Sequence, residues 1–336
     1  MSTKKYTFLD LSGYVFTGKQ AVIELVREFK GYLVPNAEFE FNLLRIQGGI
    51  LDLENALVTQ WSPIRSDAAI RRFRKLVRRM KSRNRLFKPQ TWFDAIGSDY
   101  NGYFQGQFAS LSHRYTSQLI QASWRADWPY PLTEISDLEL FWRKLKKVLG
   151  IKEALFFEMY LSQPTDFLDL TRSYLSDLLS TNANEDTKTI VMHNAFEPFN
   201  PQSSLKYFDS AKCIIIDRDP RDNFIAQLPH SHLAVSASVF VERYRLYRAM
   251  AQKSNDQDHG DILRINFENL VTQYEETRRK ILSFLNEDLS IHIHPKKYFD
   301  PALSIKNIGI WKSHPRQKDI KLIHRELKTY CHEAAD

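Results

Sequence analysis

The 336-residue sequence has few glycines, few cysteines and no long apolar runs, and each shortage excludes something. It contains 11 glycines and 2 cysteines. Cys213 and Cys331 lie far apart and provide no disulfide framework, so we expect two free thiols in a reducing compartment. No apolar run approaches the roughly 20 residues of a membrane-spanning helix, and the amino-terminal segment lacks the apolar core of a signal peptide. These absences predict a soluble, cytoplasmic protein without a transmembrane segment.

The residues that are present suit a folded protein with an anionic ligand. Hydrophobic residues make up 43% of the chain and aromatic residues 13%, which is enough for a large core. Lys and Arg number 47 against 40 acidic residues, a net charge of +7. This excess favours an anionic ligand without identifying it. We expect no nucleic acid among the partners, and the sequence leaves the oligomeric state open.

Short apolar segments alternate with helical patterns in two parts of the chain. Residues 6–12 read as a strand that leads through a glycine-rich loop into a helix ending near Gly31. Three further strands are expected at 188–193, 212–217 and 261–266. The expected helices between and after them are 221–228, 236 to about 252, 267–285 and 317–332. This alternation predicts an α/β fold of the P-loop type, three layers (α/β/α) around a central parallel sheet.

The stretch between the first strands and the later ones is mostly helical. We expect one domain over residues 1–336, with a mainly helical insertion at about 55–185. Within it, 71–88 is a basic amphipathic helix whose apolar residues recur at helical spacing. Two interpretations stay open for this helix. It is either a solvated helix that packs its apolar stripe on the core, or a contact for an anionic acceptor, a partner or a membrane surface.

The loop after the first strand has nearly the phosphate-binding pattern G-x-x-x-x-G-K-S/T. Gly13, Gly18 and Lys19 are in place, but Gln20 stands where a magnesium-binding Ser or Thr belongs. A strand that ends in glycines and enters a helix directs backbone N–H groups at an anion, and the helix dipole adds positive potential. The loop is therefore a triphosphate site without its metal ligand, a phosphate cradle that needs no metal, or a tight turn without a ligand.

A second segment, IIIDRDPRDNFIAQ at 214–227, places charged residues directly after a buried strand. Ligands of open parallel sheets bind outside the carboxyl ends of the strands, so Arg218 is expected at the same edge as the glycine loop. An arginine there can hold a phosphate with paired N–H groups. Alternatively, Arg218 and Arg221 merely pair with the neighbouring aspartates at the start of a helix.

Together these segments resemble the bacterial-type P-loop sulfotransferases that use 3′-phosphoadenosine-5′-phosphosulfate (PAPS). Besides the glycine loop and IDRDPRD, LRINFENLVTQYEETRRKILSFL at 263–285 and SIKNIGIWK at 304–312 look like segments of that family and follow in its order. The resemblance covers residues 6–30, 188–230 and 236–312. It implies a transferase with a PAPS co-substrate and no metal.

The resemblance also implies roles for individual residues. It assigns nucleotide contacts to Gly18, Lys19, Gln20, Ala21, Arg218, Phe267, Trp311 and Lys312. The first four would surround the 5′-phosphosulfate, with Lys19 at the leaving group. Arg218 would bind the 3′-phosphate, Phe267 would contact the adenine, and the last two would cover the 3′-phosphate side. His193 would take the proton of the acceptor hydroxyl; a structural histidine at a strand end is the alternative.

Two positions depart from the family pattern. The serine that usually helps to bind the 3′-phosphate is replaced by Ala226, and Gln227 or Ser231 are candidates to substitute for it. The basic residue that usually lies two places before the glycine of the loop is Phe16 here, so Lys19 is the loop's one basic candidate.

The expected activity is transfer of a sulfuryl group from PAPS to an acceptor hydroxyl, for which a carbohydrate is one candidate. Negative charge that develops on the leaving phosphate is stabilised by a lysine and loop amides, so the chemistry requires no metal in principle. Two other functions remain open. A P-loop kinase acting on a small molecule explains the glycine loop, and a non-catalytic module that binds anionic glycans or membranes explains residues 71–88.

Overall fold

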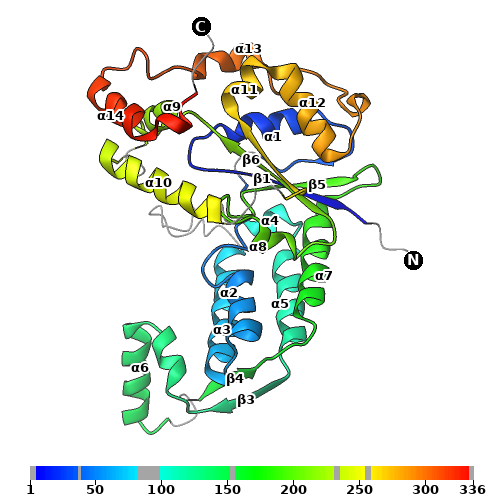
Figure 1. The fold of residues 1–336 in the computed structure, drawn as a ribbon. Helices are drawn as coiled ribbons and strands as arrows, with labels where there is room; N and C mark the ends of the chain where they lie inside the picture. Colours follow the sequence, from blue (N-terminus) through cyan, green and yellow to red (C-terminus); the bar gives the residue numbers. More distant parts are fainter. Residues whose placement is uncertain are drawn as a thin grey trace. The chain divides into compact units, whose positions relative to one another are not determined.

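The computed structural model describes residues 5–36, 39–81, 99–151, 156–230, 235–253 and 259–332. The chain divides into two compact units. Unit 1 comprises Met1–Asn42 and Ala183–Asp336, and unit 2 comprises Leu43–Asn182. Figure 1 colours the elements of both units along the sequence.

Unit 1 is built on a five-stranded sheet in the order β2-β5-β1-β6-β7. Every neighbouring pair of strands in it is parallel. The strands are β1 (Thr7–Gly13), β2 (Tyr32–Leu33), β5 (Thr189–His193), β6 (Ala211–Asp217) and β7 (Ile262–Asn266). The central strands β1 and β6 are buried along most of their length because helices cover both of their faces, and β6 is apolar from Cys213 to Ile216.

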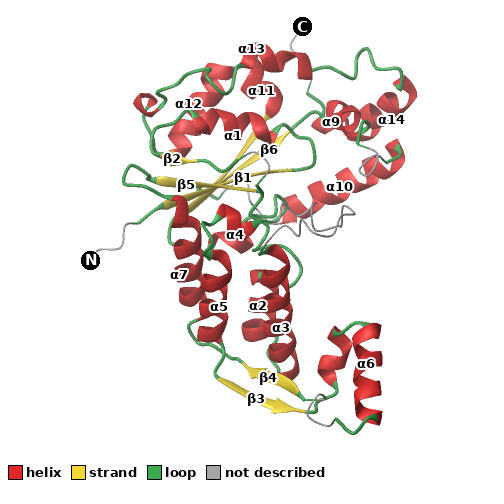
Figure 2. Cartoon of the chain, turned by 180° about the vertical axis from the view of Figure 1, so that it is seen from behind, coloured by secondary structure: helices red, strands yellow, loops and turns green. Residues whose placement is uncertain are grey.

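Helices surround this sheet as the alternating pattern predicts (Figures 1 and 2). The longer ones are α1 (Lys19–Arg27), α9 (Pro220–Gln227), α10 (Ala237–Lys253), α12 (Tyr274–Leu285) and α14 (Gln317–Leu327). Shorter helices are α8 (Gln202–Leu205), α11 (Phe267–Thr272) and α13 (Pro301–Ser304), with 3-10 turns at Leu289–Ile291, Ile305–Asn307 and Lys328–Tyr330. The P-loop-type α/β/α fold expected from the sequence is therefore confirmed.

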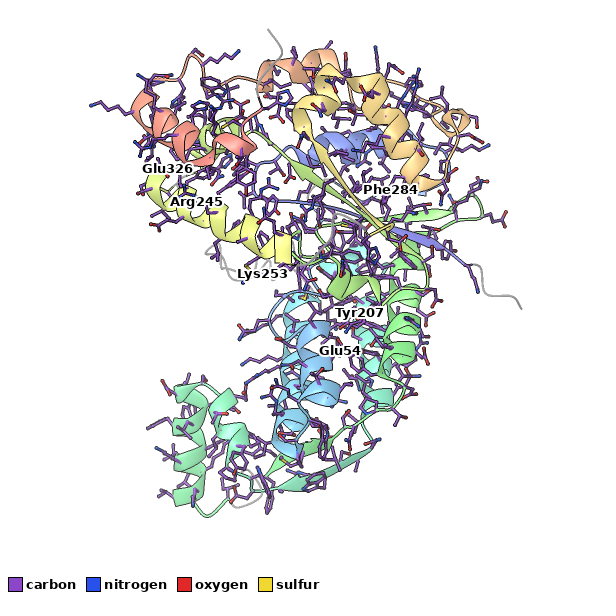
Figure 3. The ribbon with its side chains drawn as sticks, viewed as in Figure 1. Glu54, Tyr207, Arg245, Lys253, Phe284 and Glu326 are labelled. Carbon is purple, nitrogen blue, oxygen red and sulfur yellow. The ribbon has the colours of Figure 1, made fainter. Side chains whose placement is uncertain are left out.

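Two apolar clusters hold these layers together. Leu9, Leu11, Ile214 and Ile216 of the sheet share one cluster with buried residues of α1, α11 and α12. A second cluster joins α9, α10 and α14. At its surface, Arg245 of α10 pairs with Glu326 of α14 at 2.7 Å (Figure 3).

The topology fixes where a ligand of unit 1 is expected. The chain leaves β1 through α1 toward β2 on one side of the sheet, and it leaves β6 through α9 and α10 toward β7 on the other. Neighbouring strands whose connections run in opposite directions open a crevice at their carboxyl ends. The glycine loop follows β1, and Arg218 follows β6, so both border this crevice.

Unit 2 is mainly helical. Its helices are α2 (Ile50–Glu54), α3 (Pro63–Met80), α4 (Tyr100–Tyr103), α5 (Phe108–Leu119), α6 (Asp137–Val148) and α7 (Phe167–Leu179), with a π-helical turn at Asn55–Thr59 and 3-10 turns at Tyr130–Glu134 and Ser180–Asn182. Strands β3 (Ala122–Ala126) and β4 (Phe157–Leu161) pair antiparallel. The sequence analysis expected a mainly helical segment at about 55–185 and did not predict this ribbon.

Several boundaries differ from the expected ones for local reasons. The helix expected over 267–285 is interrupted at Gln273, whose φ and ψ of −120° and 48° are not helical. The helix expected over 317–332 ends at Leu327 and continues as a 3-10 turn. The basic helix begins at Pro63 behind the Ser62 cap and ends at Met80. Its expected residues 82–88 lie outside the described residues.

Candidate nucleotide-binding and catalytic site

The glycine loop has the conformation that an anion cradle needs. Gly18 is the amino-terminal cap of α1 and has φ of 86°, a left-handed conformation that favours glycine. A Cβ at this position would lie 2.4 Å from Cδ2 of Phe267. No side chain caps α1. The N–H groups of its first turn and the positive end of its dipole are therefore directed at the space in front of the glycine loop, where an anion can bind. Both the backbone angle and the close ring therefore require glycine here.

Two residues that follow β6 donate hydrogen bonds to backbone carbonyls of the glycine loop. Arg218 Nη1 donates to the carbonyl of Phe16 at 3.1 Å, and Asn223 Nδ2 donates to the carbonyl of Val15 at 2.6 Å. Phe16 has φ of 59°, which helps to turn these carbonyls toward α9. The loop and the start of α9 thus form one hydrogen-bonded body, although they lie about 200 residues apart in the sequence.

Arg218 joins three of the segments that the sequence singled out. Its Nη2 donates to the carbonyl of Asn307 at 2.6 Å, and its guanidinium lies 5.2 Å from the ring centre of Phe267. Burial lowers the pKa of Arg218, and the nearby carboxylates oppose that shift. Both of these hydrogen bonds go to carbonyl oxygens rather than carboxylates. Because these carbonyls are neutral, they do not cancel the positive charge of the Arg218 guanidinium, and an anionic ligand can pair with it.

A polar cavity of about 200 Å³ lies at the ends of β6 and β7. It is lined by two arginines, three acidic residues, Asn266 and residues 329–332; the charged ones are Arg218, Arg248, Asp217, Asp219 and Glu268. Burial raises the pKa of Glu268 to about 7, against the opposing effect of the Asp219 N–H that its side chain accepts. Glu268 is therefore partly neutral near pH 7, which reduces its repulsion of an anion beside Arg218.

Within the IDRDPRD segment, Asp219 and Arg221 pair with each other, whereas Asp217 pairs with Arg248 of α10 at 2.8 Å. Asp219 accepts the N–H of Arg221 at 2.8 Å as the cap of α9, and its carboxylate holds the Arg221 guanidinium at 2.6 Å. The Arg221 guanidinium in turn lies 4.0 Å from the ring centre of Trp311. Helix capping and mutual pairing therefore describe Asp219 and Arg221, whereas Arg218 binds the carbonyls of Phe16 and Asn307 instead of a neighbouring aspartate.

Asp222 of α9 holds the segment 304–312 through two backbone hydrogen bonds. Its two carboxylate oxygens accept the N–H groups of Gly309 at 2.7 Å and Trp311 at 3.1 Å. Gly309 has φ of 71°, and the stem of Lys312 packs against it. The Lys312 side chain is exposed. Residues 304–312 are thereby held next to the loop and Arg218, as the family order implies.

A second group of polar side chains gathers beside Lys19. Its Nζ lies 3.0 Å from Oε1 of Glu40, and the same carboxylate oxygen accepts a hydrogen bond from Nδ2 of Asn194 at 2.6 Å. Asn194 follows β5 directly and has φ of 54°, which turns the chain away from the sheet. The Glu40 side chain is 36% exposed, so the carboxylate can reach solvent or a ligand.

His193 ends β5 next to this group and is buried. Its Nδ1 lies 3.2 Å from the carbonyl of Phe39. Because a carbonyl oxygen only accepts, this contact assigns the proton to Nδ1 and the lone pair to Nε2. The carbonyl of His193 accepts the N–H of Phe41 at 2.9 Å. Both bonds connect β5 to the segment that carries Glu40.

A buried carboxylate positions the turn that follows His193. Asp10 of β1 is fully buried and accepts the N–H groups of Ala195 at 2.8 Å and Phe196 at 3.3 Å. Ser12 donates to the same carboxylate at 2.5 Å. Asp10 is thus a structural residue that fixes the end of β5 relative to the glycine loop.

The expected site residues fall into three groups. Gly18, Arg218 and Phe267 contact one another or the same loop, and Lys19 and His193 share the contacts of the Glu40 segment. Trp311 and Lys312 lie in the segment attached to α9. Gln20 is exposed and donates to Glu24 one turn along α1, and Ala21 packs on the apolar cluster beneath the loop.

The structure narrows the choice of substitute for the missing serine at Ala226. Gln227 is buried, where it donates to Asn223 at 2.5 Å and accepts from Arg243 at 2.7 Å, so its side chain serves the contact between α9 and α10. Ser231 lies outside the described residues.

The sequence analysis did not identify Glu40 or Asp10 as residues of the site. The segment around Glu40, Phe-Glu-Phe at 39–41, matches no known motif, and a single aspartate in a strand such as β1 has no recognisable pattern.

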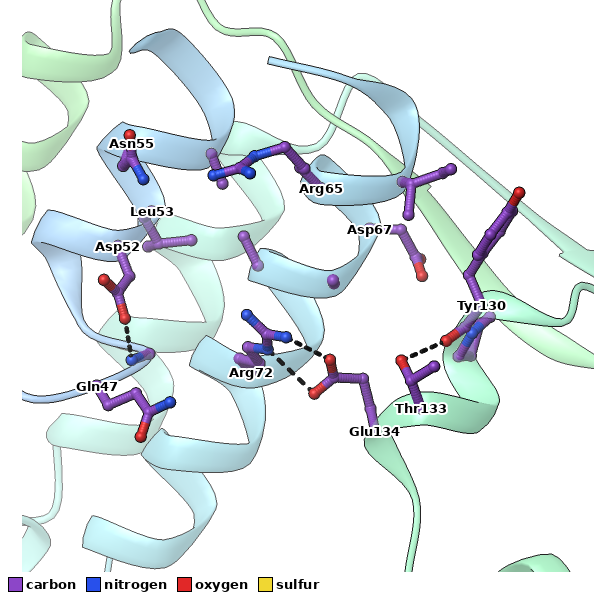
Figure 4. A pocket seen from close by; sticks show the side chains of 16 residues that line it. Gln47, Asp52, Leu53, Asn55, Arg65, Asp67, Arg72, Tyr130, Thr133 and Glu134 are labelled. Atoms are coloured by element: carbon purple, nitrogen blue, oxygen red, sulfur yellow. Dashed lines mark hydrogen bonds and ion pairs between the residues drawn. The ribbon is translucent and has the colours of Figure 1, made fainter. Parts of the chain in front are cut away.

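Unit 2 contains a separate cavity of about 490 Å³ (Figure 4). Its walls combine polar side chains, among them Asp52, Asn55 and Thr133, with apolar ones such as Leu53 and Ile64. Arg72 of α3 closes one side through two hydrogen bonds to Glu134, at 3.0 and 2.5 Å. These bonds lower the pKa of Glu134. Hydroxyl, amide and carboxylate groups of this kind suit a hydroxyl-rich molecule.

Among the described residues, no group of three or more His, Cys, Asp or Glu side chains is arranged to hold a metal ion. Within the same part of the chain, no helix is long and apolar enough to cross a membrane.

A parallel sheet with a glycine loop after its central strand and an arginine after the neighbouring strand defines a P-loop-type nucleotide-binding α/β protein. Residues 152–290 match the sequence model described as the Sulfotransferase family. This stretch contains His193, Arg218 and Phe267, whereas the glycine loop and residues 304–312 lie outside it. The expected resemblance to sulfotransferases is confirmed over this stretch, which supports a transferase.

Similar solved structures include sulfotransferases. The sulfotransferase domain from the Synechococcus PCC 7002 olefin synthase is 14% identical with a TM-score of 0.42, over 100% of this chain and 98% of that one. Sulfotransferase STF9 from Mycobacterium avium is 13% identical with a TM-score of 0.38, over 99% and 78%. No curated protein matches the chain.

Proposed function

We propose that this protein transfers a sulfuryl group from PAPS to a hydroxyl group of an acceptor. The observation that carries the proposal is the position of Arg218. Its guanidinium bonds both the glycine loop at Phe16 and the carboxy-terminal segment at Asn307. One buried cation therefore unites the two segments that the resemblance assigns to opposite ends of the nucleotide.

The residues around the loop suit the charges of such a donor. The uncapped start of α1, with Gly18, Lys19, Gln20 and Ala21, would receive the 5′-phosphosulfate. Arg218 and the polar cavity beside it would receive the 3′-phosphate, and Phe267 offers a ring for the adenine. Trp311 and Lys312 would cover the 3′-phosphate side from the segment that Asp222 holds. Loop amides and Lys19 would stabilise the negative charge of the leaving phosphate.

The reaction also needs a base for the acceptor hydroxyl, and the site offers two. His193 is one, and its Nε2 would be the basic nitrogen because Nδ1 lies 3.2 Å from the carbonyl of Phe39. Glu40 is the more exposed of the two and is oriented by Lys19 and Asn194. In the proposed step the acceptor oxygen bonds to sulfur, the bond from sulfur to the 5′-phosphate oxygen breaks, and the hydroxyl proton moves to the base. The bisphosphate leaves with the electron pair of that bond.

The acceptor is a hydroxyl compound whose class remains a prediction. A carbohydrate is one candidate, because the lining of the unit 2 cavity combines polar groups that can bind hydroxyls with apolar side chains that can pack on a sugar ring. We also propose that unit 2 is the insertion expected within a single sulfotransferase-like domain, where acceptor contacts would vary among relatives.

The kinase alternative predicts a different ligand. A kinase would bind ATP with magnesium, yet Gln20 occupies the position of the metal-binding hydroxyl and donates to Glu24 instead. Residues 218–222 and 304–312 also have no role in a kinase. The non-catalytic alternative predicts salt-sensitive binding of anionic glycans or membranes through α3 and no nucleotide affinity.

Calorimetry distinguishes these functions. Adenosine 3′,5′-bisphosphate should bind in the presence of EDTA, and Arg218→Ala should weaken it strongly, whereas Arg245→Ala on the surface of α10 should not. ATP with magnesium should bind weakly or not at all. Metal-dependent binding of ATP without bisphosphate binding would overturn the proposal in favour of a kinase, and no nucleotide binding at all would favour a binding module.

A further inference from the structure

A second cavity of unit 2, of about 610 Å³, carries a strong excess of positive charge. Its wall comes from α3, from the 3-10 turn Tyr130–Glu134, from α6 and from β4. Six arginines and Lys75 line it against three acids, which leaves an excess of four positive charges. The pair of Arg72 and Glu134 borders both this cavity and the one of about 490 Å³, from which Figure 4 shows it.

One face of α3 supplies most of these cations. Four of them follow the spacing i, i+3, i+4 and i+7 and therefore share a face of the helix: Arg71, Arg74, Lys75 and Arg78. The apolar stripe lies on the opposite face, where Phe73 and Met80 are buried. The helix thus packs its apolar stripe on the core of unit 2 and turns its cationic face to the cavity.

The acids of the wall already have partners. Three acids line the cavity, and each is used: Glu134 pairs with Arg72, Glu139 with Arg143, and Glu158 accepts the hydroxyl of Tyr160. Within the described residues this leaves no carboxylate for Arg74, Lys75 or Arg78. Arg74 is partly exposed, and the other two are exposed. Their positive charges are therefore available to an anion that enters the cavity.

Like charges crowd along α3. The helix has seven cations and one acid, Asp67, which pairs with Arg71 at 2.7 Å. The sequence from residue 68 to residue 93 contains no Asp or Glu. Cations three or four residues apart on a helix repel one another, and the helix dipole favours only those of the last turn, Arg78 and Arg79. An anion bound against the cationic face would therefore stabilise α3.

Aromatic rings of β4 orient the arginines without neutralising them. The Arg74 guanidinium lies 4.6 Å from the ring centre of Tyr160, and that of Arg71 lies 5.5 Å from the same ring. The Arg143 guanidinium lies 3.8 Å from the ring centre of Phe157. Stacking on a ring uses the face of a guanidinium and none of its N–H donors. The wall thus presents oriented arginine forks, which suit the oxygens of an anionic group.

The number and kind of charges indicate the ligand. Arginine forks match the oxygens of phosphate and carboxylate groups, and about 610 Å³ is the size of a small-molecule site. Four excess charges would require four singly charged groups, such as carboxylates, sulfate esters or phosphodiesters. Two terminal phosphate groups suffice, because each carries nearly two negative charges near pH 7. Two neighbouring phosphate groups therefore fit both the charge and the volume best.

We propose that this cavity binds a ligand with two neighbouring phosphate groups, either a free small molecule or the phosphorylated headgroup of a lipid. Arg74, Lys75 and Arg78 contact the phosphate oxygens, and the ligand relieves the repulsion along α3. The site gives a role to the basic helix, which the nucleotide site leaves unused. It does not depend on the proposed sulfuryl transfer, because every residue that carries it lies in unit 2.

Calorimetry with inorganic diphosphate tests the proposal on the full chain. The wild type should bind diphosphate in the presence of EDTA, and inorganic sulfate at least about tenfold more weakly, because a single group reaches fewer of the cations. Lys75→Glu should weaken diphosphate binding by at least about tenfold. Arg65→Glu is the matched control. It makes the same change of charge at an exposed position of the same helix, but Arg65 lines the other cavity, so this variant should bind like the wild type.

A crossed comparison separates this cavity from the nucleotide site. Arg218→Ala should leave diphosphate affinity unchanged, and Lys75→Glu should leave the affinity for adenosine 3′,5′-bisphosphate unchanged. If Arg218→Ala abolishes diphosphate binding and Lys75→Glu does not, diphosphate occupies the nucleotide site and the proposal is overturned. A chain that binds no adenosine bisphosphate would contradict the proposed function alone, as long as diphosphate binding still depends on Lys75.

Vesicle flotation identifies the source of the phosphate groups. Flotation with vesicles of phosphatidylcholine and phosphatidylinositol bisphosphate that Lys75→Glu abolishes and diphosphate reverses would support a lipid headgroup. Diphosphate binding without flotation would support a free molecule.

Three outcomes would overturn the proposal. One is a wild type that does not bind diphosphate, and another is a Lys75→Glu variant with wild-type affinity for it. The third is tighter binding of a glutamate oligomer than of diphosphate, which would identify an acidic protein segment as the occupant of the cavity.

Discussion

Lys19 Nζ lies 3.0 Å from Glu40 Oε1, so the loop lysine is paired with a carboxylate from the segment that also contacts His193. The pair is partly exposed, with 18% and 36% of the two side chains accessible. A partly exposed ion pair is worth little to stability, on the order of 0–1 kcal/mol. Its position beside the glycine loop therefore matters more for chemistry, because a sulfate group bound there would compete with Glu40 for the ammonium.

Removal of the loop lysine tests its role at the leaving group. Lys19→Met should lower turnover by about 10²- to 10³-fold, the usual effect of losing one preorganised donor at a developing anion. Lys30→Met, at an exposed position just beyond α1, should change turnover little. Steady-state kinetics with PAPS and a panel of hydroxyl acceptors measures both. Equal activity of the two variants would exclude Lys19 from the reaction.

The two candidate bases can be separated by paired substitutions. His193→Ala or Glu40→Gln should lower turnover by about 10²- to 10⁴-fold if that residue takes the proton, with bisphosphate affinity preserved. The residue that only positions the other should show a much smaller effect and an unchanged pH profile. A variant that loses nucleotide binding as well as turnover would instead report damage to the contacts between β5 and the Phe39–Phe41 segment.

Arg218 should not tolerate lysine. Its guanidinium donates to Phe16 and Asn307 through different nitrogens and covers the Phe267 ring, and a single ammonium cannot do all three. Arg218→Lys should therefore weaken bisphosphate binding by at least about tenfold although the charge is retained. Arg245→Lys, on the surface of α10, is the control, and calorimetry compares the two. Wild-type affinity in Arg218→Lys would contradict a geometric role.

Asp222→Ala should release the carboxy-terminal segment from α9. The substitution leaves the N–H groups of Gly309 and Trp311 without their acceptor, and each such loss costs on the order of 1–3 kcal/mol where water does not replace the bond. We expect a lower melting temperature and a raised KM for PAPS with a smaller effect on kcat. Asp186→Ala, at an exposed turn, should change neither.

Glu268 should make stability depend on pH. Burial raises its pKa to about 7 in the folded protein, whereas the unfolded chain releases the proton near 4.5. Between these values only the folded state holds the proton, so this carboxyl costs stability as the pH rises from about 4.5 to about 7. Glu268→Gln keeps the acceptor for the Asp219 N–H and removes the titration. Thermal melts should show that the wild type loses more stability over this interval than the variant does.

Much of unit 1 follows from sequence pattern. The apolar run at 212–217 and the glycines after the first strand predicted the two neighbouring strand ends, and the structure has β6 at 211–217 beside β1. Strand ends of a parallel sheet meet at one edge, so Arg218 could be placed near the loop without coordinates. Its actual contacts with Phe16 and Asn307 follow from the chain path of both loops and were not foreseen.

Unit 2 shows the opposite case. The aromatic-rich residues 122–161 were expected to be helical, yet β3 and β4 pair there. The pairing joins residues on either side of α6, so it depends on a contact between distant segments rather than on local periodicity.

The sequence by itself determined the alternation of strands and helices, the loop that can cradle a phosphate, and the amphipathic character of α3, because each arises from the order of neighbouring residues. Only the tertiary structure decided that Glu40 pairs with Lys19, that Asp222 holds Gly309 and Trp311, and that the apolar face of α6 points outward. These features depend on which distant segments approach one another, and periodicity along the chain contains no information about the side of a helix that a neighbour will cover.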